Sequence, residues 1–328
     1  EVVNQPLALT PGARDAVTLA PDWLQDDLAL NLARLQTMIQ NEMAGLLLDL
    51  DDPDLTDEVA FVIAHTSPEV LEYSWFFSEL IVQNARLIHE YDPVLDYVRI
   101  QNVGVPGVDP DFYTTLVYTV ETASGTEERT IEPEMYYWYV VHPRLEDEMP
   151  WYVDGWVSGD PVRPDQGWFW REFLWDAAAV DCPAERTCPL LSEQMPGIEV
   201  FKRLSEDSGF TVDAQQQVYD FVEQVLDFGA GEERPTQPNR IYAVACGNCG
   251  EYADFTVSSL RTSLIPARNC GAKSNDHTWA EWWYQGDDWH GETWFYSGGI
   301  RRDRRDNDCD GIADDSLLAG DEDGDGVD

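Results

Sequence analysis

A cysteine, a histidine and an acidic residue follow one another in the second half of this chain, in the order that a thiol-based catalytic triad requires. A cysteine attacks as the thiolate, so its pKa must fall from roughly 8.5, and a neighbouring imidazolium or a helix N-terminus lowers it. Gly247 and Gly250 flank Cys249 and leave its thiol accessible. His277 is the candidate base, and Glu292 is the candidate acid that orients the imidazole ring.

The segments around these residues predict a helix, a strand and a returning strand. The segment EYADFTVSSLRTSL has apolar residues at roughly helical spacing, so Cys249 is expected on the first turn of a buried helix, where the dipole favours a thiolate. The segment HTWAEWWY alternates as a strand does and would hold the ring of His277 still. After a GDD turn, WHGETWFY is predicted to return antiparallel and to bring Glu292 or a neighbour beside His277.

Four landmarks in this order resemble the core of the transglutaminase-like superfamily. That core has a Gly-x-Cys at a helix start, an Ile-Pro-Ala-Arg segment, a His-x-Trp-x-Glu strand and an acid beyond a following Trp. The resemblance covers residues 205–300. The corresponding residues are Gly247-Asn248-Cys249, Ile265-Pro266-Ala267-Arg268, His277-Thr278-Trp279-Ala280-Glu281, and Glu292 after Trp289.

The resemblance implies an α+β fold with a transglutaminase-like (papain-like) core of helices packed on an antiparallel sheet. It also implies that Cys249 attacks an amide carbonyl, that His277 acts as base and then protonates the leaving amine, and that Glu292 orients the ring. The family usually has Asp in this third position. If water resolves the thioester, the protein is a protease or amidase, which is the expected function. If an amine resolves it, the protein is a cross-linking transglutaminase, which is the alternative.

Other interpretations of the same residues stay open. Cys246, Cys249, Cys270 and His277 resemble a zinc-ligand series, because a further Cys and a His follow the CxxC. A CxxC also occurs in redox motifs, although no thioredoxin-like βαβ pattern surrounds it here. A third possibility is a non-catalytic calcium-binding surface module that retains the fold without the reaction. Zinc binding leaves the IPAR and HxWxE landmarks unexplained, which favours the thiol enzyme.

The C-terminal residues have the spacing D-x-D-x-D-G-x-x-D, and a second copy begins after it. Alternate carboxylates with a glycine for the sharp turn suit Ca²⁺, which takes about six to eight oxygen ligands. The pattern resembles the Asp-rich repeats of thrombospondin type 3 domains. Ca²⁺ is therefore the expected cofactor, structural and confined to the tail, with none expected for catalysis. The predicted ligands are Asp306, Asp308, Asp310, the carbonyl of Ile312, Asp314, Asp321, Asp323 and Asp325.

Charge excludes several classes of partner. The chain has 328 residues, with 20 basic and 63 acidic side chains and a formal net charge of −43. Such a surface disfavours nucleic acid and anionic membranes, and a protein or peptide is the expected substrate. No apolar run is long enough to span a membrane. The sequence does not determine the oligomeric state.

The six cysteines are compatible with an oxidising compartment. Cys182 and Cys188 flank PAERT in a Pro-containing loop and are expected to form a local disulfide. Cys246 and Cys270 are a second predicted pair, which would leave Cys249 reduced. The chain does not begin with Met, which either a removed signal peptide or a trimmed chain would explain. Together with the cysteines, this leads to the expectation of a secreted or cell-surface protein of bacterial origin.

Apolar periodicity divides the chain into a helical region, a β-rich aromatic region, a catalytic region and a calcium-binding tail. Their boundaries are 1–95, 96–180, 181–300 and 301–328. Helices are predicted at 21–50, 54–66, 67–91, 192–209 and 211–229. Strands are predicted at 96–105, 112–123 and 131–142, with a hairpin turn at 124–128 and a loop over the site entrance at 232–247.

The second region concentrates tryptophan and tyrosine between residues 136 and 175. Such a density could form a groove for sugars or peptides. Core packing is the favoured use, because aromatic residues supply most of the buried area of a core.

Overall fold

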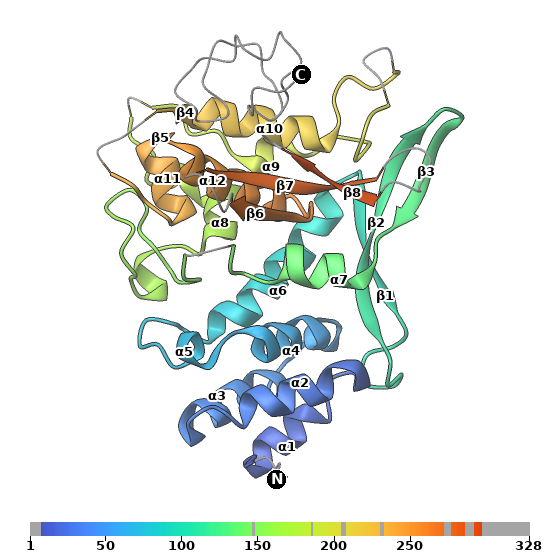
Figure 1. Ribbon diagram of the computed structural model, residues 1–328, viewed down its shortest axis with the longest axis vertical. Helices are drawn as coiled ribbons and strands as arrows, with labels where there is room; N and C mark the ends of the chain where they lie inside the picture. The colour runs from blue at the N-terminus through green and yellow to red at the C-terminus, as the bar shows by residue number, and fades with distance from the viewer. Residues whose placement is uncertain are drawn as a thin grey trace, which may run out of the picture.

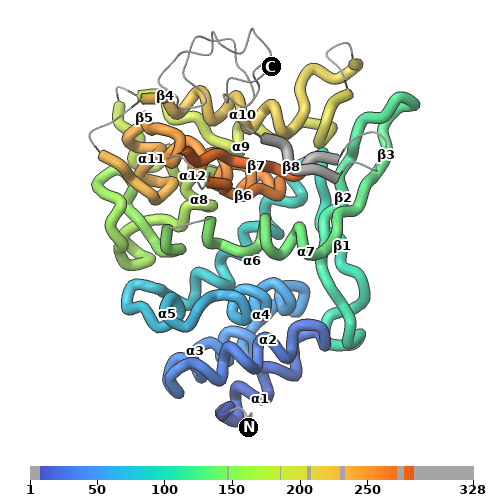
Figure 2. Tube along the Cα trace, viewed as in Figure 1, coloured from blue at the N-terminus to red at the C-terminus, as the bar shows by residue number. Residues whose placement is uncertain are grey.

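A computed structural model describes residues 8–145, 148–184, 186–204, 208–229, 233–271, 277–285 and 292–296. Figure 1 shows the N-terminal helices at one end of the molecule, the later elements at the other end, and a three-stranded sheet along one side. The tube in Figure 2 shows helix α6 (Glu79–Tyr91) leading from the N-terminal helices toward the other end. The mixture of helices and sheets confirms the α+β class.

The first 95 residues are helical, as predicted, but the helices are shorter. The expected helix at 21–50 is interrupted before Gln36, whose extended backbone donates an N–H to Oε1 of Glu72 at 2.7 Å. Buried leucines continue at helical spacing on both sides of this break, so the periodicity of the sequence does not indicate where the helix is interrupted. The expected helix at 67–91 is interrupted between residues 72 and 78. The helices are α1 (Pro11–Val17), α2 (Asp22–Leu32), α3 (Thr37–Leu48), α4 (Thr56–His65), α5 (Pro68–Leu71) and α6.

The strands β1 (Val98–Val103), β2 (Tyr113–Thr122) and β3 (Gly125–Thr130) form an antiparallel sheet in that order. β2 pairs with β1 through Val98↔Tyr118 and with β3 through Val117↔Thr130. The expected turn at 124–128 therefore belongs mostly to the returning strand β3. The turn is tighter than predicted because Gly125 adopts a φ of +129°, which a glycine tolerates best.

The prediction of a strand at 131–142 is wrong. This segment forms helix α7 (Pro133–Tyr136) and a π-helical turn (Tyr137–Val141). A proline at the first helical position favours a helix start. The buried side chains have helical spacing, which outweighs the aromatic and β-branched composition that predicted a strand. They are Tyr136, Tyr137, Val140 and Val141.

The second half of the chain surrounds one central helix, α12 (Cys249–Thr262). It packs against strands β6 and β7 and against helices α8, α10 and α11. β6, β7 and β8 form an antiparallel sheet in that order, and β4 pairs in parallel with β5. The bounds are α8 (Trp170–Trp175), α9 (Leu191–Gln194), α10 (Ala214–Val225), β4 (Asp227–Phe228), α11 (Pro238–Val244), β5 (Cys246–Gly247), β6 (Ala267–Gly271), β7 (Thr278–Gln285) and β8 (Glu292–Tyr296).

Two further predictions for this half are corrected. Only α9 is helical in the described part of 192–209, because the chain then runs beside β2, where Phe201 donates its N–H to the carbonyl of Thr119 at 2.8 Å. The expected loop at 232–247 contains α11, which begins with Pro238 at its first position. The predicted helix at 211–229 is present as α10, with Asp213 as its cap accepting from the N–H of Gln216 at 2.8 Å.

Two buried arginines join the C-terminal end of α12 to the rest of the molecule. Arg171 donates to the amide oxygen of Asn84 at 3.0 Å and to the carbonyls of Val140 and Arg261. Arg261 donates to the carbonyls of Ala267, His142 and Arg144 at 2.8, 2.9 and 3.0 Å. Burial lowers the pKa of the Arg171 side chain to about 9. Each buried guanidinium thus satisfies its charge with several carbonyl dipoles.

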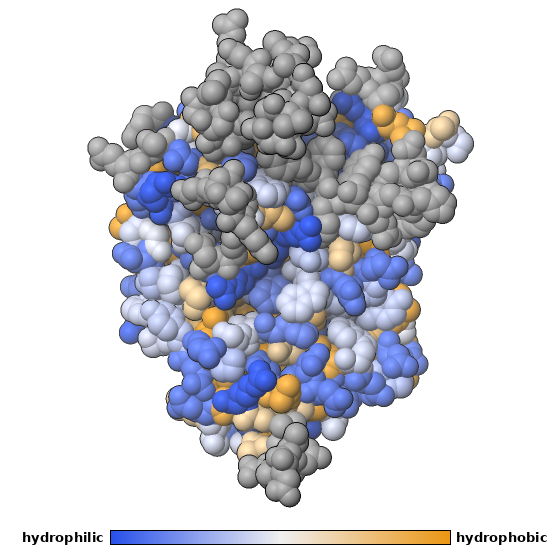
Figure 3. Space-filling model, viewed as in Figure 1, coloured by the Kyte–Doolittle hydropathy of each residue, from blue (hydrophilic) through white to orange (hydrophobic). Residues whose placement is uncertain are grey.

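In the described part of the chain, one hydrophobic core includes side chains from α1 through β7. Most aromatic residues between 136 and 175 pack into it, as predicted, and Trp170 is only 1% exposed, whereas Trp138 is 41% exposed. Hydrophilic side chains cover most of the coloured surface in Figure 3, with hydrophobic ones scattered among them. None of the helices in the described part of the chain has the length and apolar character that a membrane span needs.

Candidate active site

Cys249 is the first residue of α12, as the sequence predicted, and it is half-buried. A capping box holds this end of the helix. The side chain of Asn248 accepts the backbone N–H of Glu251, and Oε2 of Glu251 accepts the backbone N–H of Asn248 at 2.9 Å. The thiol therefore lies where the unpaired amides of the first turn concentrate positive potential, which favours an anion such as a thiolate.

Glu251 is 4% exposed, so its charge needs a partner. Arg234 supplies it, with Nη2 donating to Oε2 of Glu251 at 3.0 Å and Nε donating to Oε1. The guanidinium offsets a carboxylate that would otherwise oppose a thiolate on Cys249. Neither Glu251 nor Arg234 is among the residues predicted from the sequence, although the Asn-x-x-Glu spacing of a capping box is present there.

Gly247 must be a glycine for steric reasons. A Cβ built on it would collide with the Cβ of Glu251, so a side chain here would displace the capping box. A Cβ on Gly250 would meet open space. The two glycines that flank Cys249 therefore differ: Gly247 permits the close approach of the chain to the helix, and Gly250 leaves space beside the thiol.

His277 immediately precedes β7, which packs against α12. Its ring stacks on the indole of Trp279 with centroids 5.4 Å apart and an interplanar angle of 29°. The adjoining pair Gly271↔Thr278 fixes where the strand begins. The helix that begins with Cys249 is thus in direct contact with the strand that begins immediately after His277. The prediction of a strand at HTWAEWWY is confirmed.

The landmarks IPAR and HxWxE meet across the β6–β7 ladder. Arg268 lies opposite Glu281 in the register, and its Nη2 and Nε donate to Oε2 of Glu281 at 2.7 and 2.9 Å. Trp279 donates its Nε1–H to the other oxygen of Glu281 at 3.1 Å. On the opposite face of β6, Asn269 donates to Oδ1 of Asp254 on α12 at 2.6 Å. These bonds fix the sheet relative to α12 and so position His277.

The cysteines differ sharply in their surroundings. Burial, helped by a hydrogen bond to Glu281, raises the pKa of the Cys270 thiol to about 11, so Cys270 stays protonated at neutral pH. The thiol of Cys246 donates to the carbonyl of Gly229 at 3.1 Å. Neither has the position at a helix start that Cys249 has.

The predicted disulfide between Cys182 and Cys188 is confirmed, with a Cα–Cα distance of 6.2 Å. The predicted pair Cys246–Cys270 is wrong, since neither residue is in a disulfide. The reason is placement: Cys246 lies on β5 beside β4, whereas Cys270 lies on β6 within the hydrogen-bonded group around Glu281. Cys249 is not in a disulfide either, as predicted.

The described residues contain no group of three or more His, Cys, Asp or Glu side chains arranged to hold a metal ion. The four candidate zinc ligands lie within the described ranges, so they are not gathered into a single site.

The register of β8 corrects the expected position of Glu292. β8 pairs with β7 through Gln285↔Glu292 and Glu281↔Tyr296. Glu292 therefore lies opposite residue 285, eight positions after His277. At about 3.3 Å per residue this is roughly 26 Å along the strand. The expectation that the returning strand brings Glu292 beside His277 is not met, because the hairpin pairs Glu292 with the far end of β7.

Some predicted residues lie outside the described part of the chain. They are the turn residues Asp287 and Asp288, together with Trp289, and the predicted calcium ligands Asp306, Asp308, Asp310, Ile312, Asp314, Asp321, Asp323 and Asp325.

Comparison with protein families identifies residues 200–291 as matching the family model of the transglutaminase-like superfamily. The match contains α10, α11, α12, β6 and β7, and with them Cys249, His277 and the ion pair between the landmarks. It ends one residue before Glu292. Comparisons with curated proteins and with solved structures give no significant match. The family generally contains cysteine-dependent enzymes, and the residues that match it include the complete Cys249 helix.

Proposed function

We propose that this protein is a cysteine-dependent enzyme that acts on amide bonds of proteins or peptides through a thioester on Cys249. The observation that carries the proposal is the position of Cys249 as the first residue of α12, at a capped helix N-terminus that packs against the strand following His277. The family match of residues 200–291 supports the same class of chemistry.

The proposed reaction has two stages. The Cys249 thiolate attacks the amide carbonyl carbon, and the amide N–H groups at the start of α12 stabilise the negative oxygen that forms. The C–N bond breaks as the His277 imidazolium protonates the leaving amine, which leaves a thioester on Cys249. In the second stage His277 removes a proton from water, the hydroxide oxygen attacks the thioester, and the acid product leaves as the thiolate re-forms. Glu292 is not part of this scheme, because its backbone pairs with the far end of β7.

Hydrolysis is the proposed outcome, with transfer of the acyl group to a primary amine as the second candidate. Both share the first stage, so the geometry around Cys249 supports them equally. A peptide-library incubation with an added primary amine separates them. Cleaved peptides without amine adducts support hydrolysis. Peptides in which the added amine is attached to a glutamine or to another acyl donor support cross-linking.

Thiol reactivity tests the proposal against a non-catalytic surface module. We expect iodoacetamide at about pH 6 to alkylate Cys249 first, because a helix N-terminus favours the thiolate that reacts. Cys246 on β5 and Cys270 on β6 are matched internal controls, because neither is in a disulfide. Peptide-resolved mass spectrometry reads all three at once. Equal or slower alkylation of Cys249 would contradict the proposal.

We further propose that the protein is secreted or presented at a cell surface and that its tail binds Ca²⁺. The disulfide between Cys182 and Cys188 is compatible with an oxidising compartment and supports the first statement. The twofold D-x-D-x-D-G spacing supports the second. The calcium would be structural and remote from the thiol chemistry in sequence.

A further inference from the structure

A pocket of about 530 Å³ opens in the N-terminal half of the molecule between α2, α4, α7 and the π-helical turn. Its lining includes no residue of α12, β6, β7 or β8, so the pocket is distinct from the Cys249 region, although the π-helical turn also contacts α12 and β6. Figure 1 shows α2 and α4 toward the N-terminal end of the molecule. We call this pocket the aromatic pocket. It is lined by Trp23, Asp27, Phe61, His65, Tyr113, Glu132, Pro133, Glu134, Tyr137 and Trp138.

Aromatic rings in mutual contact form much of this lining. Tyr137 packs against Trp23 and Phe61 with ring centroids 5.1 and 5.0 Å apart. The ring of Trp138 packs edge to face against Phe61, with centroids 5.0 Å apart, and its centroid lies 4.7 Å from that of the His65 ring. Phe61 and Tyr137 are buried, whereas Trp23 and Trp138 are each 41% exposed, so the lining combines two buried rings with two indoles that are accessible from solvent.

Hydrogen bonds hold key rings in place. The hydroxyl of Tyr137 donates to Oδ2 of buried Asp57 at 2.6 Å and accepts the N–H of Thr114 at 2.8 Å. The indole N–H of Trp23 donates to the carbonyl of Phe112 at 3.0 Å. Tyr137 and Trp138 lie in the π-helical turn, and such turns occur often at functional sites. The pocket is thus preorganised, which reduces the entropic cost of binding.

The charge of the lining has one sign. It includes the carboxylates of Asp27, Glu132 and Glu134, and none of its ten residues is Lys or Arg. Burial lowers the pKa of His65, although Asp27 acts in the opposite direction, so His65 is neutral at pH 7. A ligand that suits this pocket is therefore cationic. Aromatic faces attract cations through the ring quadrupole, most strongly when the cation is desolvated.

We propose that the aromatic pocket binds a quaternary ammonium group of the choline type. A quaternary ammonium has no N–H to satisfy, so it can lie against the rings of Phe61, Tyr137 and Trp138 without losing hydrogen bonds. A hydrated metal ion needs a shell of oxygen ligands, which these rings do not supply. The rim carboxylates Glu132 and Glu134 complement the ligand charge.

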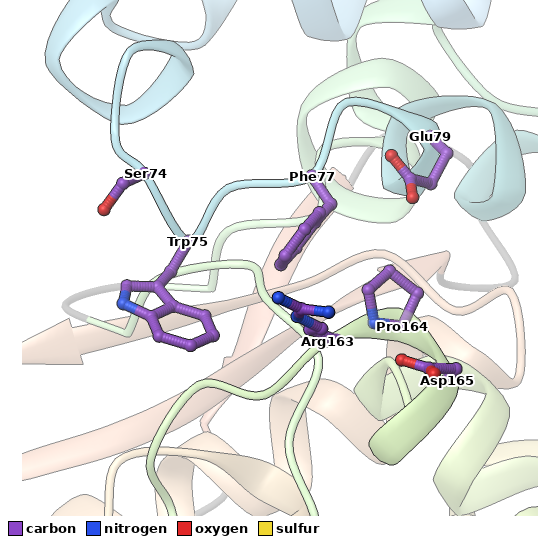
Figure 4. Close-up of a pocket in the computed structure, with 7 residues that line it drawn as sticks. All are labelled: Ser74, Trp75, Phe77, Glu79, Arg163, Pro164 and Asp165. Carbon is purple, nitrogen blue, oxygen red and sulfur yellow. The ribbon is translucent and has the colours of Figure 1, made fainter.

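A second aromatic pocket in the described chain provides a contrast. It is lined by Trp75 and Phe77 together with Arg163, Glu79 and Asp165. Figure 4 shows the guanidinium of Arg163 extending into the space near Trp75 and Phe77. This pocket already contains a cation of the protein itself, so it has no comparable preference for a cationic ligand. Trp75 is 39% exposed, close to the exposure of Trp138, which makes it a matched control.

Isothermal titration of the full chain with choline tests the proposal, with 3,3-dimethyl-1-butanol as a neutral probe of the same shape. We expect millimolar or tighter binding of choline and at least tenfold weaker binding of the neutral probe. We expect Trp138→Ala to weaken choline binding about tenfold and Glu134→Gln to weaken it less, with Trp75→Ala without effect.

Proton NMR of choline provides a second readout, because rings above the methyl groups shift their signal upfield on binding. Alkylation of Cys249 should be unchanged in Trp138→Ala, which shows that the variant is folded. Equal binding of both probes would overturn the proposal, and so would undetectable choline binding at about 50 mM. An equal loss in Trp75→Ala and Trp138→Ala would also overturn it, since the site would then not be the aromatic pocket.

Discussion

Three cysteines in the second half of the chain show how position decides chemistry. Cys249 lies at a helix start, Cys270 is half-buried and hydrogen-bonded to Glu281, and Cys246 donates to a backbone carbonyl. Of the three, Cys249 is the one at a helix N-terminus, where the amide groups of the first turn attract an anion. The sequence already singled out Cys249 as the nucleophile, whereas the fold shows that Cys246 and Cys270 are not paired with each other.

We expect Cys249→Ala and His277→Ala each to abolish turnover, by at least about 10³-fold, while the protein stays folded. The double variant should be no slower than either single variant, because the two residues act as one unit. Cys246→Ser is the matched control, since a hydroxyl can still donate to Gly229. Steady-state kinetics on a verified substrate, with circular dichroism, measures this. Wild-type turnover by Cys249→Ala would remove Cys249 from the mechanism.

At the scale of elements, the segment from β5 to α12 sets the geometry of the site. We expect Gly247→Ala to lower stability by about 1–3 kcal/mol and to reduce turnover, because its Cβ collides with Glu251. Gly250→Ala should be neutral or stabilising by about 0.5–1 kcal/mol, since its Cβ meets open space within a helix. Urea unfolding of both variants gives the comparison. A similar loss in both would mean that the steric argument is wrong.

The register of β8 gives a prediction about the third catalytic residue. Glu292 lies opposite Gln285, so we expect Glu292→Gln to keep most of the turnover, within about threefold of the parent. The sequence resemblance alone predicts a larger loss, because it makes Glu292 the acid that orients His277. Rates and pH profiles for Glu292→Gln and for Gln285→Ala as a neighbouring control distinguish these. A loss near that of His277→Ala would show that the hairpin pairs differently in solution.

The sequence predicted the elements with strong local signals. The segment after Cys249 has apolar residues at helical spacing, and the segment after His277 alternates cleanly. The predicted helix and strand are both present. It failed where tertiary context decides. The aromatic run at 131–142 is a strand by composition, yet its buried residues have helical spacing. The predicted Glu292 contact failed because register depends on a hairpin whose turn the sequence does not fix.

At the scale of the molecule, the catalytic region shares a core with the N-terminal half. Tyr118 on β2 donates to the carbonyl of Leu264 at 2.5 Å, and Tyr97, just before β1, donates to that of Ser263, so these tyrosines hold the two residues after α12. Arg171 and Arg261 add further bonds. These links across distant parts of the chain were invisible to periodicity, which treats each segment separately. They imply that the N-terminal half supports the geometry of the site.

A buried acidic group gives this architecture a pH dependence. Nε2 of His89 lies 2.9 Å from Oε1 of Glu58, which is fully buried. Burial alone would lower the pKa of His89, but the Glu58 carboxylate outweighs it and raises the pKa to about 9. Because the pKa of His89 is higher in the folded protein, its protonation stabilises the fold. This contribution is fully present below about pH 6.5 and is lost as the pH rises through about 9.

We therefore expect His89→Gln to destabilise the protein by a few kcal/mol at pH 6 and by much less at pH 9.5. Urea unfolding of parent and variant at both pH values measures the difference, and His65→Gln, a variant of a histidine whose pKa is lowered, is the control. A loss that stays constant across this range would mean that the charge of His89 contributes nothing.

The tail adds a separate prediction. We expect Ca²⁺ to bind through the first Asp-rich copy and to protect the tail from proteolysis, while alkylation of Cys249 is unchanged, since the catalytic landmarks lie wholly upstream. Calorimetry on the parent and on Asp308→Ala/Asp310→Ala gives the measurement. Equal calcium uptake by the two proteins would reduce the tail to a solvated acidic segment.

The central claim is a thioester on Cys249, and trapping it is the most direct test. A peptide library is incubated with the protein, quenched in acid within seconds, and the digested protein is mapped by mass spectrometry. We expect an acyl adduct on the Cys249 peptide that hydroxylamine removes, and no adduct on Cys246, Cys270 or the Cys249→Ala variant. Turnover of the library without an adduct on Cys249, or with full activity in Cys249→Ala, would contradict the claim.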